Sequence, residues 1–242
     1  MKIFAVIVTL FVVGSLAGWI IELFYRRFIS QKKWMNPGFL TGPYLPIYGF
    51  GVLGMYGLSE LFIALDLVNK FQVPAAVSYI IQVLAIGVIL ITIEFIAGLI
   101  FIKGLGMKLW DYSKQWGNTF GVICPLYDVI WTAAGALYYF FIHPYLKDGI
   151  MWLAQEDHNI YYLFVGVVLG MMIVDFFYSA HVATAIVRFA KTNKVVVKLS
   201  EVQAKLKEKN ESFKKNLFIF PTVNHIKEVL AKFKSNEDNQ ED

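Results

Sequence analysis

The sequence has 242 residues, of which 57% are hydrophobic and 17% are charged. Soluble domains typically have roughly 25% charged residues, so the composition argues against a soluble protein and for a chain embedded in lipid. The formal net charge is only +4, and the basic residues lie beside the apolar segments. Nucleic acid is therefore not an expected partner, whereas the lipid bilayer is.

Five apolar segments are each long enough to cross about 30 Å of hydrocarbon, which needs roughly 20 helical residues. They cover residues 3–25, about 44–65, 76–102, about 122–142 and about 160–187. The first could be a signal peptide, because residues 15–17 resemble a cleavage site, but it continues beyond them and ends in Arg26 and Arg27. The sequence predicts an all-α integral membrane protein with about five transmembrane helices.

The distribution of Lys and Arg predicts the orientation of these helices. One side of the membrane would hold Arg26, Arg27, Lys32, Lys33, Lys103, Lys108 and Lys114, and the other would hold Lys2, Lys70 and Lys147. The side richer in basic residues is expected to be cytoplasmic. The N-terminus is then outside, the C-terminus is inside, and the expected location is the inner membrane of a bacterial cell.

The chain is expected to have three parts. Residues 1–190 form a polytopic membrane domain, residues 191–234 a basic and amphipathic helical tail in the cytoplasm, and residues 235–242 a disordered acidic end. In the tail, one stripe of a helix carries Val223, Ile226, Val229, Leu230 and Phe233. Such a stripe fits a helix at a membrane surface and equally a helix docked on another protein.

A short motif occurs twice and predicts an internal repeat. Residues 42–48 and residues 121–127 both read Gly-x-x-x-Pro-aliphatic-Tyr. Each copy begins a helix that leaves the cytoplasm and follows a helix with an acid near its inner end, Glu22 or Glu94. Asp175, in an acid-apolar-Phe-Tyr sequence like that of Glu22, suggests a further half repeat. Two-helix units would be related by a pseudo-twofold axis along the membrane normal.

Acidic residues within apolar helices are the main candidates for function. An acid at the centre of a membrane helix costs about 2.5–3.5 kcal/mol on insertion scales, so it needs a partner, water or a proton. Glu94, Asp128 and Asp175 are expected to face a polar interior, whereas Glu22 could equally lie at the interface beside Arg26. The predicted pathway comprises Glu22, Glu94, Asp128 and Asp175, with Tyr48 and Tyr127 at its inner mouth.

The loops before the two motif copies are expected to re-enter the membrane protein and face a vestibule, because non-helical backbone at membrane depth must be buried in protein or reached by water. Proline at a helix start removes an amide that would have no partner, and glycine permits close approach of the chain. The predicted loop motif residues are Asn36, Gly42, Pro46, Trp110, Asp111, Tyr112, Asn118, Gly121 and Pro125.

Other motifs predict no cofactor. Residues 49–54 fit G-x-G-x-x-G, but they lie in an apolar segment without a preceding strand, so we interpret them as a helix-packing face. The sequence has no Walker A motif, no H-E-x-x-H and no Cys/His metal spacing. Gly14 with Gly18, and Gly166 with Gly170, are G-x-x-x-G spacings typical of close helix contacts, which would also allow a homodimer.

Three blocks of sequence resemble a known membrane family. They are residues 18–22 (Gly-Trp-Ile-Ile-Glu), residues 36–51 and residues 110–113 (Trp-Asp-Tyr-Ser), the last followed by Asn118, Gly121 and Cys124. Over residues 18–144 the chain resembles the bacterial family described as putative ABC-transporter permeases of type IV. The resemblance implies transport. Since the sequence carries no nucleotide hydrolase motif, energy-coupled transport would need a separate nucleotide-binding subunit.

Three functions remain open at this point. The first is a small multi-pass transporter or permease-like subunit with an acid-lined polar interior. The second is a membrane adaptor or sensor that does not transport and whose tail docks on a partner or on the membrane surface. The third is an enzyme acting on a lipid through the loop that contains Trp110, Asp111 and Tyr112. The absence of hydrolase motifs makes the two non-enzymatic functions the stronger predictions.

Overall fold

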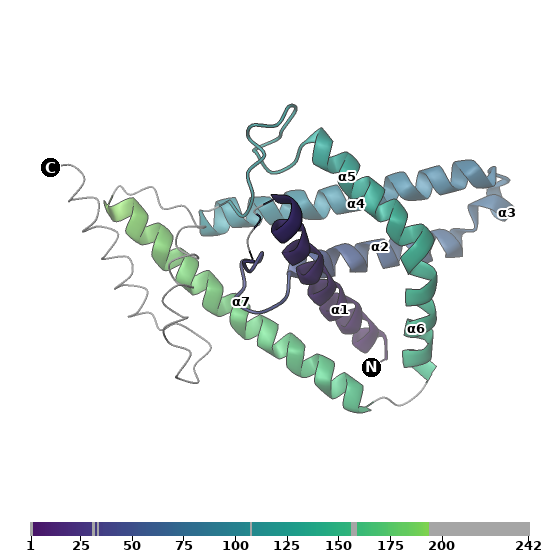
Figure 1. The fold of residues 1–242 in the computed structure, drawn as a ribbon. Coiled ribbons are helices and arrows are strands. Elements are labelled where there is room, and N and C mark those ends of the chain that lie inside the picture. The colour runs from purple at the N-terminus through teal and green to yellow at the C-terminus, as the bar shows by residue number, and fades with distance from the viewer. Residues whose placement is uncertain (1, 31, 33, 107, 156–158, 194–242) are drawn as a thin grey trace. The chain divides into compact units, whose positions relative to one another are not determined.

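The computed structural model describes residues 2–30, 32, 34–106, 108–155 and 159–193, and throughout these residues the fold is all-α (Figure 1). The predicted fold class is confirmed. The chain divides into two compact units, Met1–Gly104 with Lys108–Asp175, and Leu105–Met107 with Phe176–Asp242. The candidate functional site and the cavity described below belong to the first unit.

The helices follow one another in a simple order. They are α1 (Lys2–Tyr25), η1 (Arg26–Ser30), α2 (Pro46–Leu65), α3 (Leu67–Phe71), α4 (Ala75–Ile100), η2 (Phe101–Leu105), α5 (Pro125–Leu137), η3 (Tyr138–Ile142), α6 (His143–Gln155) and α7 (Asn159–Asn193), where η marks a π-helical turn. The long helices α2 and α4 run side by side, joined through the short α3, and α5 packs on α4 (Figure 1).

Four of the predicted spans form helices that are long and apolar enough to cross a membrane: Ile3–Ser30, Pro46–Leu65, Ala75–Leu105 and Ile160–Ala185. The segment 122–142 is helical from Pro125 but is not among them, so the described residues hold one candidate span fewer than predicted. Asp128 in its first turn and His143 at its end shorten the apolar run. The stretch continues through η3 and bends into α6 (Figure 1), at a π-helical turn followed by Pro144.

Small residues let the paired helices approach closely. On α1, an added Cβ at Gly18 would lie 2.1 Å from Tyr48 Cγ of α2, and one at Gly14 would lie 2.9 Å from Val52. The predicted close contact at Gly14 and Gly18 is therefore confirmed, and it lies within the chain. On α4, an added Cβ at Gly98 would lie 2.2 Å from Val122 Cγ1. The glycine therefore also allows the chain that leads into α5 to pack closely against α4.

The other G-x-x-x-G spacing behaves differently. A Cβ added at Gly166 or Gly170 of α7 would meet no described heavy atom within 4 Å. Their predicted helix contact is therefore not formed within the described part of the chain, and a homodimer at this face stays a prediction.

A buried cluster joins α1, the loop before α2 and the first half of α7. Its members are Val12, Leu40, Tyr44, Val165, Val168 and Met172. Because Leu40 and Tyr44 supply loop side chains to this core, the loop is buried in protein as expected for non-helical backbone in a membrane protein. The predicted amphipathic tail and acidic end, residues 194–242, lie outside the described residues.

Candidate functional site

Asp175 is buried on α7, with 1% of its surface exposed. Its Oδ1 accepts hydrogen bonds from the Thr41 amide (3.2 Å) and the Thr41 hydroxyl (2.7 Å), and its Oδ2 accepts one from the Gly42 amide (2.9 Å). All three donors belong to the loop before α2. Asp175 thus attaches this loop to α7, and both of its carboxylate oxygens have partners.

Glu22 lies near the end of α1 and is half-buried. Its Oε1 accepts a hydrogen bond from Arg26 Nε at 3.0 Å, one helical turn later, and its Oε2 accepts one from the Tyr48 hydroxyl at 3.3 Å. The interaction with Arg26 is the i,i+4 ion pair expected for an interfacial acid. Glu22 therefore has a cation and a hydroxyl on its two oxygens.

Glu94 is buried on α4, with 4% of its surface exposed, and its two oxygens differ. Oε1 accepts a hydrogen bond from the Tyr112 hydroxyl at 3.1 Å. Oε2 is buried and has no partner at hydrogen-bonding geometry among the described residues, although the Trp131 side chain lies beside the carboxyl group. A buried polar atom without a partner carries a desolvation penalty of roughly 1–3 kcal/mol, more when charged.

Tyr112 connects the second loop to two helices. Its hydroxyl donates to Glu94 of α4, and its ring stacks on Tyr127 of α5 with centroids 4.2 Å apart and planes 9° apart. Burial and the neighbouring carboxyl group of Glu94 raise the pKa of the Tyr112 phenol above its ordinary value, so the hydroxyl keeps its proton and acts as a donor. From the sequence, Tyr112 was predicted to be a loop motif residue, and its contact with Glu94 was not predicted.

Asp128 lies in the first turn of α5, where the positive end of the helix dipole stabilises a carboxylate. Its Oδ1 is buried and has no hydrogen-bond partner among the described residues. Tyr127, the preceding residue, faces the loop through the stack on Tyr112. The structure thus brings Glu94, Tyr112 and Tyr127 together, with Glu22 near Tyr48 and Tyr127, and holds Asp175 apart at the first loop.

The first loop is organised by Asn36. Its side-chain amide donates to the carbonyl oxygens of Leu40 (2.9 Å) and Thr41 (3.1 Å), and its Oδ1 accepts from the Trp19 indole (2.8 Å) and the Gly38 amide (3.2 Å). The side chain of Asn36 therefore folds the loop back on itself and ties it to α1. Asn36 was predicted to be a loop motif residue, and these hydrogen bonds show that it stabilises the conformation of the first loop.

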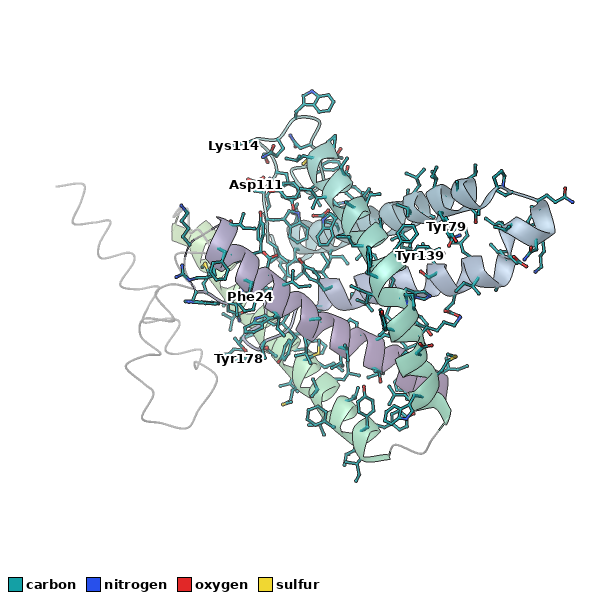
Figure 2. The ribbon with its side chains drawn as sticks, turned by 45° about the vertical axis from the view of Figure 1, so that its right-hand side comes forward. Phe24, Tyr79, Asp111, Lys114, Tyr139 and Tyr178 are labelled. Carbon is teal, nitrogen blue, oxygen red and sulfur yellow. The ribbon has the colours of Figure 1, made fainter. Side chains whose placement is uncertain are left out.

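The second loop is organised by Asn118 and Asp111. Asn118 donates to the carbonyl oxygens of Ser113 (3.2 Å) and Gln115 (2.9 Å) and accepts from the Gly121 amide (3.1 Å). Asp111 accepts from the Lys108 ammonium at 2.9 Å and from the Ser113 hydroxyl. Figure 2 shows Asp111 and Lys114 on this loop between α4 and α5. The loop is therefore held by contacts of its own.

The hydrogen bonds to Asp111 in the second loop are exposed to solvent, yet they stabilise its charged form. The hydrogen bonds from Ser113 and Lys108 lower the pKa of Asp111 to about 2. The Trp110 indole donates to the Val122 carbonyl at 2.8 Å, which fixes the end of the loop against its beginning. Gly121 has φ +68°, a conformation that glycine adopts readily and most other residues do not.

Proline begins both helices that follow the loops. Pro46 and Pro125 each lie in the first turn, where an amide would have no intrahelical partner. Gly42 lies against Tyr44, because an added Cβ would be 2.4 Å from Tyr44 Cζ. The predicted roles of proline and glycine in these motifs agree with this local geometry.

A cavity of about 550 Å³ lies among the helices of the first unit. It is lined by α1, α2, α4, α5, η3, α6 and the start of α7, and nearly all lining side chains are apolar or aromatic. Of the four predicted acids only Glu94 lines it, and of the two predicted tyrosines only Tyr48 does. The wall of this cavity is therefore apolar with one carboxyl group, and the pathway of four acids stays a prediction.

A second polar cluster was not predicted from the sequence. Glu60 of α2 lies 3.2 Å from His143 Nε2 and 3.1 Å from Lys147 Nζ of α6. The Tyr138 hydroxyl lies 3.3 Å from His143 Nδ1. The signal that could have revealed the cluster is an acid inside an apolar segment, Glu60, together with a His and a Lys one turn apart. It ties α2 to α6.

No three His, Cys, Asp or Glu side chains meet as a metal site would require in the part of the chain that the structure describes. The model of the family described as "Putative ABC-transporter type IV" matches residues 9–180. This range includes every predicted site residue and extends beyond the region 18–144 that carries the sequence resemblance. Comparison with curated proteins and with solved structures gives no match.

Proposed function

Because the chain belongs to the family described as "Putative ABC-transporter type IV", we propose that it is the membrane-spanning subunit of a transporter. Its solute passes through the cavity among α1, α2, α4, α5 and α6. The observation that carries the proposal is this cavity of about 550 Å³, a size typical of small-molecule sites, with one buried carboxyl group on its wall. A separate nucleotide-binding subunit supplies the energy, since the sequence has no Walker A motif.

The proposed setting is the inner membrane of a bacterial cell, with the N-terminus outside. This topology requires the bent stretch from α5 to α6 to cross the membrane in addition to the four candidate spans. Cysteine at Lys70 or Lys147, in a Cys124→Ala background, should react with an impermeant thiol reagent in intact cells. Cysteine at Lys103 or Lys114 should react only after the cells are opened. The reverse pattern would contradict the orientation.

Transport can be tested before the solute is identified. Cells that express the native chain together with its partner subunit are compared by mass spectrometry with cells that lack the chain. We expect the amount of at least one small molecule inside the cell to change at least twofold. Ala134→Trp, which fills the cavity, should abolish the change. Val88→Trp, on an exposed face of α4, should not.

Identical solute profiles with and without the native chain would contradict transport and favour the adaptor. One observation supports that second candidate. The second loop is held by its own hydrogen bonds, yet Trp116 at its tip is 85% exposed. An exposed large aromatic side chain on a loop that is ordered by its own hydrogen bonds is typical of a surface that binds another protein. Loss of partner binding on Trp116→Ala, with unchanged solute profiles, would assign the chain to the adaptor class.

A further inference from the structure

The cavity wall has few polar groups, and two of them lack partners. Among the described residues, Thr9 Oγ1 and Glu94 Oε2 are buried, line the cavity and have no donor at normal hydrogen-bond geometry, although the Trp131 side chain lies beside the Glu94 carboxyl group. The lining includes no Lys, Arg or His side chain. The carboxyl group of Glu94 therefore has no cation on the wall to neutralise it.

Of the four predicted acids, Glu94 is the one that lines the cavity, whereas Asp128, whose Oδ1 also lacks a hydrogen-bond partner, does not. Glu22 has Arg26 on one oxygen and Tyr48 on the other, and Asp175 has donors on both oxygens. A buried carboxyl oxygen that keeps no partner is expensive, so its presence on a cavity wall indicates that a ligand supplies the missing donor.

Aromatic rings beside Glu94 favour a cationic donor. Tyr48 and Trp131 both line the cavity, with ring centroids 5.6 Å apart and planes 63° apart. The face of an aromatic ring attracts ammonium groups, most strongly where water is excluded. A carboxyl group next to two aromatic side chains is therefore suited to an ammonium group, and less suited to a hydroxyl or a carboxylate.

The rest of the wall determines what is attached to that ammonium group. Away from Glu94 the lining is aliphatic and aromatic, for example Val13, Val52, Leu90 and Ile150. Such a wall gains stability by covering an alkyl chain, at about 0.8 kcal/mol per buried CH₂ group. A phosphate would find no basic residue among the lining side chains, so an aminophospholipid headgroup fits poorly.

We propose that the cavity binds amphiphilic amines, with the ammonium group at Glu94 beside Tyr48 and Trp131 and the alkyl chain along the apolar wall. This inference rests on the proposed transport function and deepens it by naming the class of solute. A protein that transports a different solute would pass the profiling test described above and fail the binding test that follows.

The test is ligand binding by the full chain in nanodiscs of phosphatidylcholine. The probes are dodecylamine, dodecanol and dodecanoate, three chains of equal length with different head groups. Binding is measured by radioligand retention, with empty nanodiscs subtracted to remove partition into lipid. We expect saturable binding of dodecylamine with a Kd at least tenfold lower than that of dodecanol, and no saturable binding of dodecanoate.

Two variants and one control separate the site from general effects. Glu94→Gln should bring the Kd of dodecylamine to that of dodecanol, and Ala134→Trp should abolish binding of both. Asp66→Asn removes the same charge from the turn between α2 and α3, and asparagine tolerates the left-handed conformation there, so binding should match that of the native chain.

The outcomes are distinct. An equal Kd for dodecylamine in the native chain and in Glu94→Gln would overturn the proposal, as would the absence of saturable binding in the native chain. Replacing phosphatidylcholine by phosphatidylethanolamine should leave the Kd of dodecylamine unchanged. Competition by phosphatidylethanolamine would identify the ligand as a lipid headgroup and would also overturn the proposal.

Discussion

The two helix–loop–helix segments, α1 to α2 and α4 to α5, use similar residues in different ways. Both have an acid near the end of the first helix, an asparagine that folds the loop, and proline at the start of the second helix. In the first segment Asp175 of α7 binds the loop and the acid, Glu22, is paired. In the second segment the loop is held by Asn118 and by Tyr112, which donates to the acid, Glu94, and one oxygen of Glu94 lacks a partner.

One sequence position explains much of this difference. The residue four positions after Glu22 is Arg26, which pairs with it, whereas the residue four positions after Glu94 is Gly98. Gly98 has no side chain to offer, and it lets Val122 approach α4. The first acid is therefore neutralised by its own helix, and the second remains available to a ligand. Whether an acid in a membrane helix is neutralised therefore depends on the residues one helical turn away.

The largest effect is expected from removing the acid that fixes the first loop. Asp175→Ala leaves the amides of Thr41 and Gly42 without partners in a buried site, so we expect a loss of about 3–5 kcal/mol in the free energy of unfolding. The measurement is unfolding of the purified protein in mixed micelles with increasing dodecyl sulfate, followed by tryptophan fluorescence.

Glu94→Gln is the matched comparison for Asp175→Ala, because it removes a buried acid that has an open oxygen. We expect this variant to be as stable as the native protein or more stable, since an unpaired buried charge is removed. Equal losses for the two variants would contradict the division into an anchoring acid and a ligand-binding acid.

The sequence predicted the helices better than it predicted the site. Long apolar runs determine membrane helices directly, so four of the five spans follow from composition. The predicted repeat agrees with the shared loop contacts and stays a prediction. The polar pathway of four acids could not be resolved from sequence, because whether a carboxyl group is satisfied depends on contacts such as Asp175 with Gly42, which are distant in the chain.

A medium effect is expected at the contact between the second loop and α4. Tyr112→Phe removes the phenol hydroxyl that donates to Glu94 Oε1 and keeps the ring stacked on Tyr127. We expect a loss of about 1–3 kcal/mol in the free energy of unfolding, because a buried carboxyl group loses its hydrogen bond. The same dodecyl sulfate titration measures it.

A double-mutant cycle gives the control for Tyr112→Phe. In a Glu94→Leu background the Tyr112 hydroxyl has no carboxyl group to which it can donate. Tyr112→Phe should therefore lower the free energy of unfolding clearly less in that background. The same loss in both backgrounds would mean that Tyr112 stabilises the loop only through its ring and its other neighbours.

The smallest effect is expected at Asp111 on the exposed surface of the second loop, and it depends on pH. The pKa of Asp111 is lowered from its ordinary value of 3.8 to about 2, so the folded loop favours the charged form. The stabilisation is therefore present above about pH 4 and is lost as the pH falls toward 2. Because the side chain is exposed and Lys108 is partly exposed, the effect on the stability of the whole protein is small, and it should be measured in the loop itself.

Proteolysis of the second loop can measure this effect. Pepsin is active across this pH range and can cleave beside Trp116 or Phe120, which are both exposed. Asp111→Asn should be cleaved in the loop faster than the native protein at pH 4, and the ratio of the two rates should approach one at pH 2, with cleavage elsewhere in the chain as the internal reference. A ratio independent of pH would show that Asp111 holds the loop by contacts that do not need its charge.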